Sequence, residues 1–156
     1  MKEIQVSVII VNYNTLKQTC ECIDSICEKT RDVSYEIILI DNASTDGSKD
    51  FFEKDKRVRY VYSYENMGFG RANNVGMMLA KGEYFFLLNS DTLLVNNAIK
   101  EFYDYASNHT KNTFYGCWLQ DIESNYIHSC ARYPSPWSMI KNILNTLSFA
   151  SVNHIA

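Results

Sequence analysis

Short apolar runs alternate with longer amphipathic stretches along the first ninety residues of the chain. The runs are rich in β-branched and aromatic residues and predict strands at residues 5–11, 35–40, 58–62 and 84–88. The stretches between them have helical spacing and predict helices at residues 15–28, 45–54 and 71–80. Alternating strands and helices predict parallel pairing through right-handed crossovers.

The fourth apolar run, residues 84–88, holds five apolar residues of which three are aromatic. A run of this kind is typical of a strand covered on both faces. It stops abruptly at Asn89, Ser90 and Asp91. Ligands of open α/β sheets bind outside the carboxyl ends of the strands, so Asp91 is expected to face a crevice.

The pattern changes after Asp91. A helix is expected at residues 97–108, followed by two short strands at 113–119 and 126–128 around a polar turn. The predicted fold is therefore α/β and Rossmann-like: a mostly parallel sheet flanked by helices, with a short antiparallel edge after residue 112. We expect one domain at residues 5–136, followed by an amphipathic helix and tail at 137–156.

Composition excludes several classes of protein. The chain has 156 residues, 46% of them hydrophobic, and a net charge of −3, which argues against general nucleic-acid binding. No apolar run is long enough for a transmembrane segment, and we expect a cytoplasmic protein. The amphipathic helix predicts packing against a partner segment, with peripheral membrane contact as the weaker alternative. The five cysteines have neither a disulfide pattern nor zinc-site spacing.

Polar clusters follow the predicted strands at residues 12–14, 41–47 and 89–91, and the loop 66–70 follows the third. Each cluster alone is ordinary turn chemistry. Together, at the ends of parallel strands, they predict a single cleft. A dinucleotide fingerprint is the alternative for Gly68 and Gly70, but Asn73 stands where its third glycine belongs.

The combination of these segments resembles family 2 glycosyltransferases of the GT-A fold. The resemblance covers roughly residues 5–136. The segments that carry it are residues 8–14 (VIIVNYN), 38–48 (ILIDNASTDGS), 66–69 (NMGF), 73–76 (NNVG) and 87–92 (LLNSDT).

The resemblance implies a nucleotide-sugar site. Asp41 would contact the base, and Asp91 would coordinate Mg²⁺ or Mn²⁺ bridging the diphosphate. Ser90 or Asn89 would face the ribose or the sugar. The remaining expected donor-binding residues are Val11, Asn12, Tyr13, Gly68 and Phe69.

The implied activity is inverting, metal-dependent transfer of a sugar from a nucleoside diphosphate sugar to an acceptor hydroxyl. The acceptor would be a glycan or a lipid-linked group in cell-surface polysaccharide synthesis. The catalytic base is expected beyond Ala156, since no Asp or Glu follows Glu123 and the chain resembles a truncated enzyme. The alternatives are a non-catalytic nucleotide-sugar-binding remnant, one half of a split enzyme, and a doubly wound domain unrelated to sugar transfer.

Overall fold

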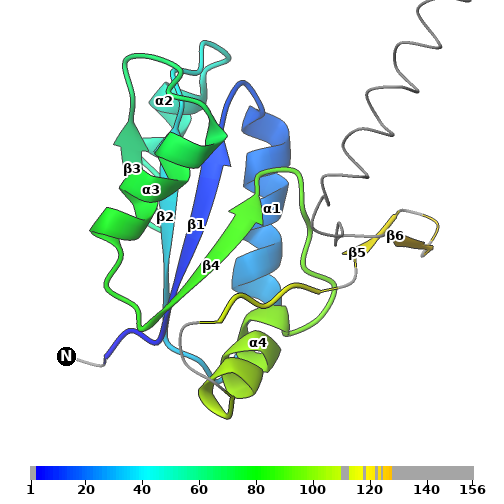
Figure 1. The fold of residues 1–156 in the computed structure, drawn as a ribbon. Coiled ribbons are helices and arrows are strands. Elements are labelled where there is room, and N and C mark those ends of the chain that lie inside the picture. Colours follow the sequence, from blue (N-terminus) through cyan, green and yellow to red (C-terminus); the bar gives the residue numbers. More distant parts are fainter. Residues whose placement is uncertain (1–2, 110–112, 118, 122, 124, 128–156) are drawn as a thin grey trace, which may run out of the picture. The chain divides into compact units, whose positions relative to one another are not determined.

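The computed structural model describes residues 3–109, 113–117, 119–121, 123 and 125–127. Its main unit is built on a four-stranded sheet with the order β3-β2-β1-β4. The strands are β1 (Val6–Asn12), β2 (Tyr35–Asp41), β3 (Arg59–Tyr62) and β4 (Tyr84–Asn89). The helices are α1 (Leu16–Lys29), α2 (Ser48–Phe52), α3 (Phe69–Leu79) and α4 (Ala98–Ser107). All four strands run parallel, as the sequence predicts (Figure 1).

Strand register places the predicted polar clusters at one edge of the sheet. Asn12 pairs with Asp41 across β1 and β2, and Val11 pairs with Asn89 across β1 and β4. The chain builds β2 and β3 on one side of β1 and then returns to place β4 on the other side. The order of the strands therefore reverses between β1 and β4, where open α/β sheets form their ligand crevice.

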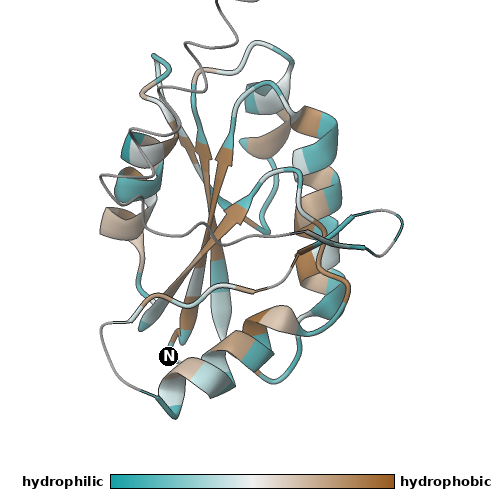
Figure 2. Cartoon of the chain, turned by 45° about the vertical axis from the view of Figure 1, so that its right-hand side comes forward, coloured by the Kyte–Doolittle hydropathy of each residue, from teal (hydrophilic) through white to brown (hydrophobic). Residues whose placement is uncertain are grey.

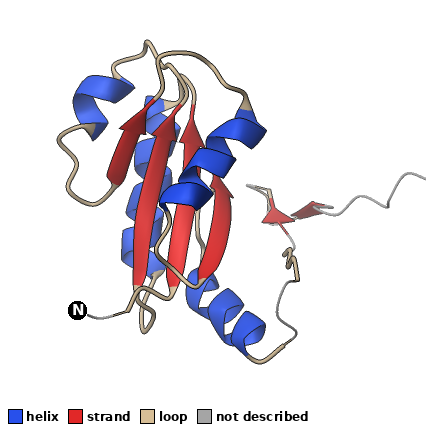
Figure 3. Cartoon of the chain, turned by 60° about the vertical axis from the view of Figure 1, so that its left-hand side comes forward, coloured by secondary structure: helices blue, strands red, loops and turns tan. Residues whose placement is uncertain are grey.

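Helices cover the two faces of the sheet separately (Figure 3). Val8 and Ile10 of β1 belong to the larger core, which also contains Ile23 of α1, Phe52 of α2 and Ile99 of α4. The opposite face carries the smaller core with α3, whose members are Val11, Ile38, Ile40 and Ala72. The strands are accordingly the most continuously apolar elements of the main unit (Figure 2).

Helix α3 approaches β1 closely at Gly76. A Cβ atom at this position would lie 2.4 Å from Cγ2 of Ile9, which is too close for any real contact. Gly76 therefore sets the separation between α3 and the sheet. The helix in turn begins at the loop of the candidate site.

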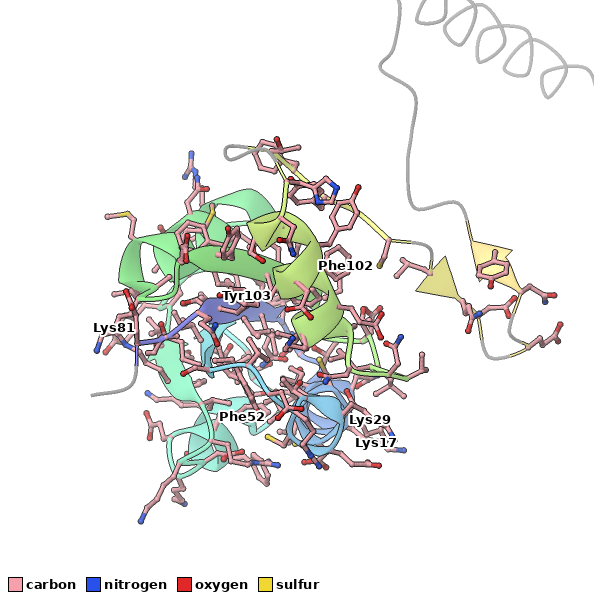
Figure 4. All side chains as sticks on the ribbon, turned by 90° about the horizontal axis from the view of Figure 1, so that it is seen from below. Lys17, Lys29, Phe52, Lys81, Phe102 and Tyr103 are labelled. Atoms are coloured by element: carbon pink, nitrogen blue, oxygen red, sulfur yellow. The ribbon has the colours of Figure 1, made fainter. Side chains whose placement is uncertain are left out.

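Strand β4 is covered on one face only, so the expectation of cover on both faces is wrong for the described residues. Phe86 packs edge-to-face on Phe102 with ring centroids 5.3 Å apart, and Tyr84 packs in the same way on Tyr103 at 5.7 Å. Figure 4 labels Phe102 and Tyr103 on α4. On the other face Phe85 and Leu87 are half exposed, because α3 packs on β1 and β2. Apolar composition alone overestimated the burial of this strand.

Two predicted boundaries need correction. Helix α2 begins at Ser48, later than residue 45, because the preceding turn contains Ala43 and Gly47 at φ values of 68° and 91°. Neither φ is helical. The first of the two late strands is also much shorter than predicted, since residues 113–117 are not a strand.

A second unit starts at Phe114. In it β5 (Leu119–Gln120) and β6 (Tyr126–Ile127) form the expected antiparallel pair, as a two-stranded sheet of their own. The predicted amphipathic helix and tail at residues 137–156 lie outside the described residues.

Candidate functional site

The candidate site lies where the four parallel strands end. In Figure 1 the arrowheads of β1 to β4 point to the same end of the sheet, and the loops that follow them lie there together. These loops contain the polar clusters singled out in the sequence. Hydrogen bonds from side chains of these clusters connect the loops to one another.

Asn12 is the centre of the network and is fully buried at the end of β1. Its Oδ1 accepts hydrogen bonds from the hydroxyls of Thr15 at 2.8 Å and Thr19 at 3.0 Å. Its Nδ2 donates to Oγ of Ser44 at 3.0 Å, and the same Oγ accepts the amide of Asn14 at 2.9 Å. Asn12 therefore joins the end of β1, the start of α1 and the loop after β2.

Asp41 is also fully buried, at the end of β2. Its Oδ1 accepts the amide of Ser44 at 2.8 Å, and its Oδ2 accepts the hydroxyl of Tyr60 at 2.7 Å. Burial raises the pKa of Tyr60, and the hydrogen bond and charge of Asp41 raise it further, so this phenol stays protonated as a donor. The carboxylate thus fixes the shape of the loop after β2.

Asn42 connects that loop to residues 66–68, the part of the loop 66–70 that precedes α3. Its Oδ1 accepts the amide of Met67 at 2.8 Å, and its Nδ2 donates to Oδ1 of Asn66 at 2.7 Å. The same Asn66 oxygen accepts the amide of Gly68 at 2.9 Å. Gly68 has a φ of 78° and open space around its Cα, so backbone conformation is the reason for glycine here.

Asp46 caps two helices at once. One carboxylate oxygen accepts the amide of Leu16, the first residue of α1, at 2.8 Å. The other accepts the amide and hydroxyl of Ser48, the first residue of α2, at 3.1 and 2.6 Å. Burial alone would raise the pKa of Asp46, but these hydrogen bonds outweigh it and leave the pKa below its ordinary value. Asp46 was expected inside α2 and instead lies before it.

The segment after β4 forms a tight turn in which the amide of Thr92 donates to the carbonyl of Asn89 at 3.1 Å. The hydroxyl of Ser90 points back to Oγ1 of Thr15 at 3.1 Å. The side chains of Asn89 and Asp91 are exposed. Burial, with the nearby charge of Asp91, raises the pKa of the Cys22 thiol to about 12, so Cys22 stays protonated.

The exposed carboxylate at this turn fits a hard divalent cation that receives most of its ligands from phosphate and water. No group of three His, Cys, Asp or Glu side chains in the described part of the chain is placed to hold a metal by itself. Mg²⁺ in nucleotide sites commonly uses one or two carboxylates and completes its shell with phosphate oxygens and water. The single carboxylate of Asp91 is sufficient for this arrangement. It is exposed, and it accepts no hydrogen bond from the described residues.

The structure brings most of the predicted residues to one edge but gives them different surroundings. Tyr13 and Phe69 are 49% and 57% exposed, so their rings are available to a ligand. Asn12 and Asp41 face inward, and the side chain of Val11 belongs to the core with α3.

Sequence reasoning missed three residues that hold the loops together, namely Thr15, Thr19 and Tyr60, whereas Asn42 and Asn66 lie in the predicted polar segments without having been given a role. Thr15 and Thr19 share a helix face four residues apart, a spacing visible in the sequence. No comparable signal points to Tyr60, which reaches Asp41 only through the pairing of β2 with β3.

Within the described part of the chain, no helix is both long and apolar enough to cross a bilayer.

Comparison with known proteins places this arrangement in context. The model of the family described as glycosyl transferase family 2 matches residues 7–155. The glycosyltransferase GlyG of Streptococcus pneumoniae is 33% identical over 124 residues, covering 77% of this chain and 41% of GlyG. The chain thus spans less than half the length of this relative.

Solved structures give the same architecture. TarS 1–349 of S. aureus in complex with UDP-GlcNAc superposes with a TM-score of 0.61 at 25% identity, covering 68% of this chain and 32% of TarS. The mannosyltransferase PcManGT of Pyrobaculum calidifontis, in complex with GDP-Man and Mn²⁺, gives a TM-score of 0.54 at 27% identity. That match covers 60% of this chain and 29% of PcManGT. Both matches support the GT-A fold of the main unit.

Proposed function

Because the chain belongs to glycosyl transferase family 2, we propose that it provides the donor site for transfer of a sugar from a nucleoside diphosphate sugar to an acceptor hydroxyl. The observation that carries this proposal is the network at the carboxyl edge of the sheet. There Asn12 and Asp41 join the loops after β1 and β2, Thr15 joins them to the turn after β4, and the exposed Asp91 lies on that turn.

The exposed and buried residues have different parts in this proposal. The aromatic rings of Tyr13 and Phe69 and the open backbone at Gly68 offer contacts to a nucleotide. Asp41 was expected to contact the base; because it is fully buried, it acts on the base through the loop whose shape it holds by its bonds to Ser44 and Tyr60. Complexes of the similar structures with UDP-GlcNAc and GDP-Man support a nucleotide-sugar donor.

Asp91 is proposed as the protein ligand of Mg²⁺ or Mn²⁺. Breaking the bond between sugar and phosphate leaves extra negative charge on the nucleoside diphosphate. A hard divalent cation supplies the positive charge that stabilises this leaving group. The Mn²⁺ in the PcManGT complex supports a metal at a site of this kind.

Inversion at the anomeric carbon and a role in cell-surface polysaccharide synthesis remain proposals that rest on the resemblance to the family. A carboxylate base would take the acceptor proton during attack from the opposite face of the sugar. A cytoplasmic location and a glycan or lipid-linked acceptor belong to the same proposal.

A second function, nucleotide-sugar binding without transfer, is favoured by one observation. Residues 124–156 contain no Asp or Glu, so this segment offers no carboxylate base. A transfer assay with the same donor separates the two functions. Turnover with a defined acceptor would exclude the binding-only function, whereas donor binding without turnover would support it.

Calorimetric titration with UDP-, GDP- and dTDP-sugars in Mn²⁺ tests donor binding. We expect one class of donor to bind, and Asp91→Asn or a chelator to weaken that binding at least tenfold, as loss of a metal contact predicts. Asp104→Asn is the matched control, because Asp104 is an exposed acid paired with Lys100 on α4. Failure of every donor to bind would contradict the proposed function. Binding that is insensitive to both Asp91→Asn and chelator would contradict only the metal.

A further inference from the structure

Thr15 links the two halves of the candidate site. Its hydroxyl lies 2.8 Å from Oδ1 of Asn12 and 3.1 Å from Oγ of Ser90. Asn12 leads through Ser44 to the loop after β2, whereas Ser90 precedes Asp91 in the turn after β4. The Thr15 hydroxyl is therefore a direct side-chain connection between the loop shaped by Asp41 and the turn that carries Asp91.

The direction of these hydrogen bonds follows from the donors involved. The Thr15 amide can only donate and lies 3.3 Å from the Asn12 side chain, so the atom facing it is the oxygen Oδ1. That oxygen can only accept, so the Thr15 hydroxyl gives its single hydrogen to Asn12. Ser90 must then donate its hydrogen to Thr15.

This direction has two consequences for the turn after β4. The hydroxyl of Ser90 is held inward, and its lone pairs remain available to accept a hydrogen bond from a ligand. Among the described residues, the other contacts of this turn are the pairing of Asn89 with Val11 of β1, the hydrogen bond from the Thr92 amide to the Asn89 carbonyl, and a weak contact from the Cys22 thiol to the same carbonyl at 3.7 Å.

We propose that Thr15 is a positioning residue, whose hydroxyl holds Ser90 and thereby sets the position of Asp91 relative to the Asp41 loop. The expected effect of Thr15 on binding of metal and nucleotide rests on the proposed function. Its effect on the turn itself depends only on the hydrogen bonds of the protein. Thr15 touches neither metal nor donor in this scheme.

Two substitutions separate the hydroxyl from the shape of the side chain. Thr15→Val keeps the branched shape and removes the hydroxyl, whereas Thr15→Ser keeps the hydroxyl. Thr30→Val is the matched control, because Thr30 Oγ1 is buried without a hydrogen-bond partner among the described residues and Thr30 lies at the opposite end of α1. Thermal unfolding of each variant verifies that it is folded.

The ligand measurement uses the nucleoside diphosphate, UDP or GDP, of the donor found by titration. Its affinity is measured with Mn²⁺ and again with EDTA. We expect Thr15→Val to reduce the ratio of these affinities about fivefold to tenfold, the effect of one hydrogen bond, with metal-free affinity changed less than about twofold. Thr15→Ser and Thr30→Val should keep the ratio of the unsubstituted chain. An unchanged ratio in Thr15→Val would overturn the inference.

Amide hydrogen exchange of Thr92 tests the same inference without a ligand. We expect exchange about fivefold to tenfold faster in Thr15→Val and nearly unchanged in Thr15→Ser. If the unsubstituted chain binds no donor while Thr92 still responds, the proposed function has failed and the positioning role stands. If Thr92 exchanges equally in all variants, or Thr15→Ser behaves like Thr15→Val, the hydroxyl has no positioning role.

Discussion

The hydroxyl of Tyr60 lies 2.7 Å from Oδ2 of Asp41, and the two side chains come from neighbouring strands of the sheet. Asp41 is fully buried, and its other oxygen accepts the amide of Ser44. A buried carboxylate needs such donors, because an unpaired one is strongly unfavourable. This pair therefore stabilises the fold and holds the loop of the candidate site.

Tyr60→Phe should destabilise the protein by about 1–3 kcal/mol, because it leaves one oxygen of a buried carboxylate without its donor. Urea unfolding measures this change. Tyr64→Phe is the matched control, since Tyr64 is almost fully exposed, and it should change stability by less than about 0.5 kcal/mol. Equal effects of the two substitutions would mean that the bond to Asp41 contributes nothing.

Asp46→Ala should destabilise the protein by about 1–2 kcal/mol, because one carboxylate caps both α1 and α2. Urea unfolding at neutral pH measures the loss. Asp50→Ala removes a negative charge from the first turn of α2 but no side-chain hydrogen bond among the described residues, and it should cost less. A larger loss in Asp50→Ala would show that charge, and not capping, is the dominant effect.

The contribution of Asp46 should also depend on pH. Its pKa in the folded chain lies below the ordinary value of 3.8, so the ionised form favours folding. That contribution is fully present above the ordinary value and is lost as pH falls through the lowered folded pKa. The difference in unfolding free energy between the unsubstituted chain and Asp46→Ala should therefore shrink below about pH 4. A difference that grows on acidification would contradict the capping role.

Gly76→Ala should destabilise the protein by about 1–3 kcal/mol, because the new Cβ would overlap Cγ2 of Ile9 in the buried strand β1. Gly70→Ala, in the same helix, meets no atom within 4 Å and should be neutral or stabilising by up to about 1 kcal/mol. Thermal unfolding of both variants measures the contrast. Equal effects of the two substitutions would show that α3 moves away from the sheet at little cost.

Thr30→Val should stabilise the protein by up to about 1 kcal/mol. The Oγ1 atom of Thr30 is buried with no hydrogen-bond partner in the described part of the chain, and valine has nearly the same shape without that polar atom. Thr30→Ser keeps the hydroxyl and should not stabilise. Destabilisation by Thr30→Val, measured by urea unfolding, would show that the hydroxyl is satisfied in solution.

Periodicity in the sequence was sufficient to predict the order of β1 to β4 along the chain and their parallel pairing. Strands such as residues 5–11 and 35–40 are nearly continuous apolar runs, and their fully buried centres require no knowledge of distant contacts. The same reasoning failed for β4. Whether Phe85 and Leu87 are covered depends on where α3 packs, and the composition of the strand does not determine that position.

The candidate site shows the same division. The sequence alone determined which residues reach the carboxyl edge, because parallel strands must end there together, and so Asn12, Asp41 and Asp91 could be named in advance. Only the tertiary structure decided that Asn12 and Asp41 face inward while Asp91 remains exposed. Tyr60 reaches Asp41 only through the pairing of β2 with β3, a long-range interaction that local residue patterns do not encode. The bond from Thr15 to Asn12 is local, because the two residues are three positions apart, but its link to Ser90 depends on the pairing of β1 with β4.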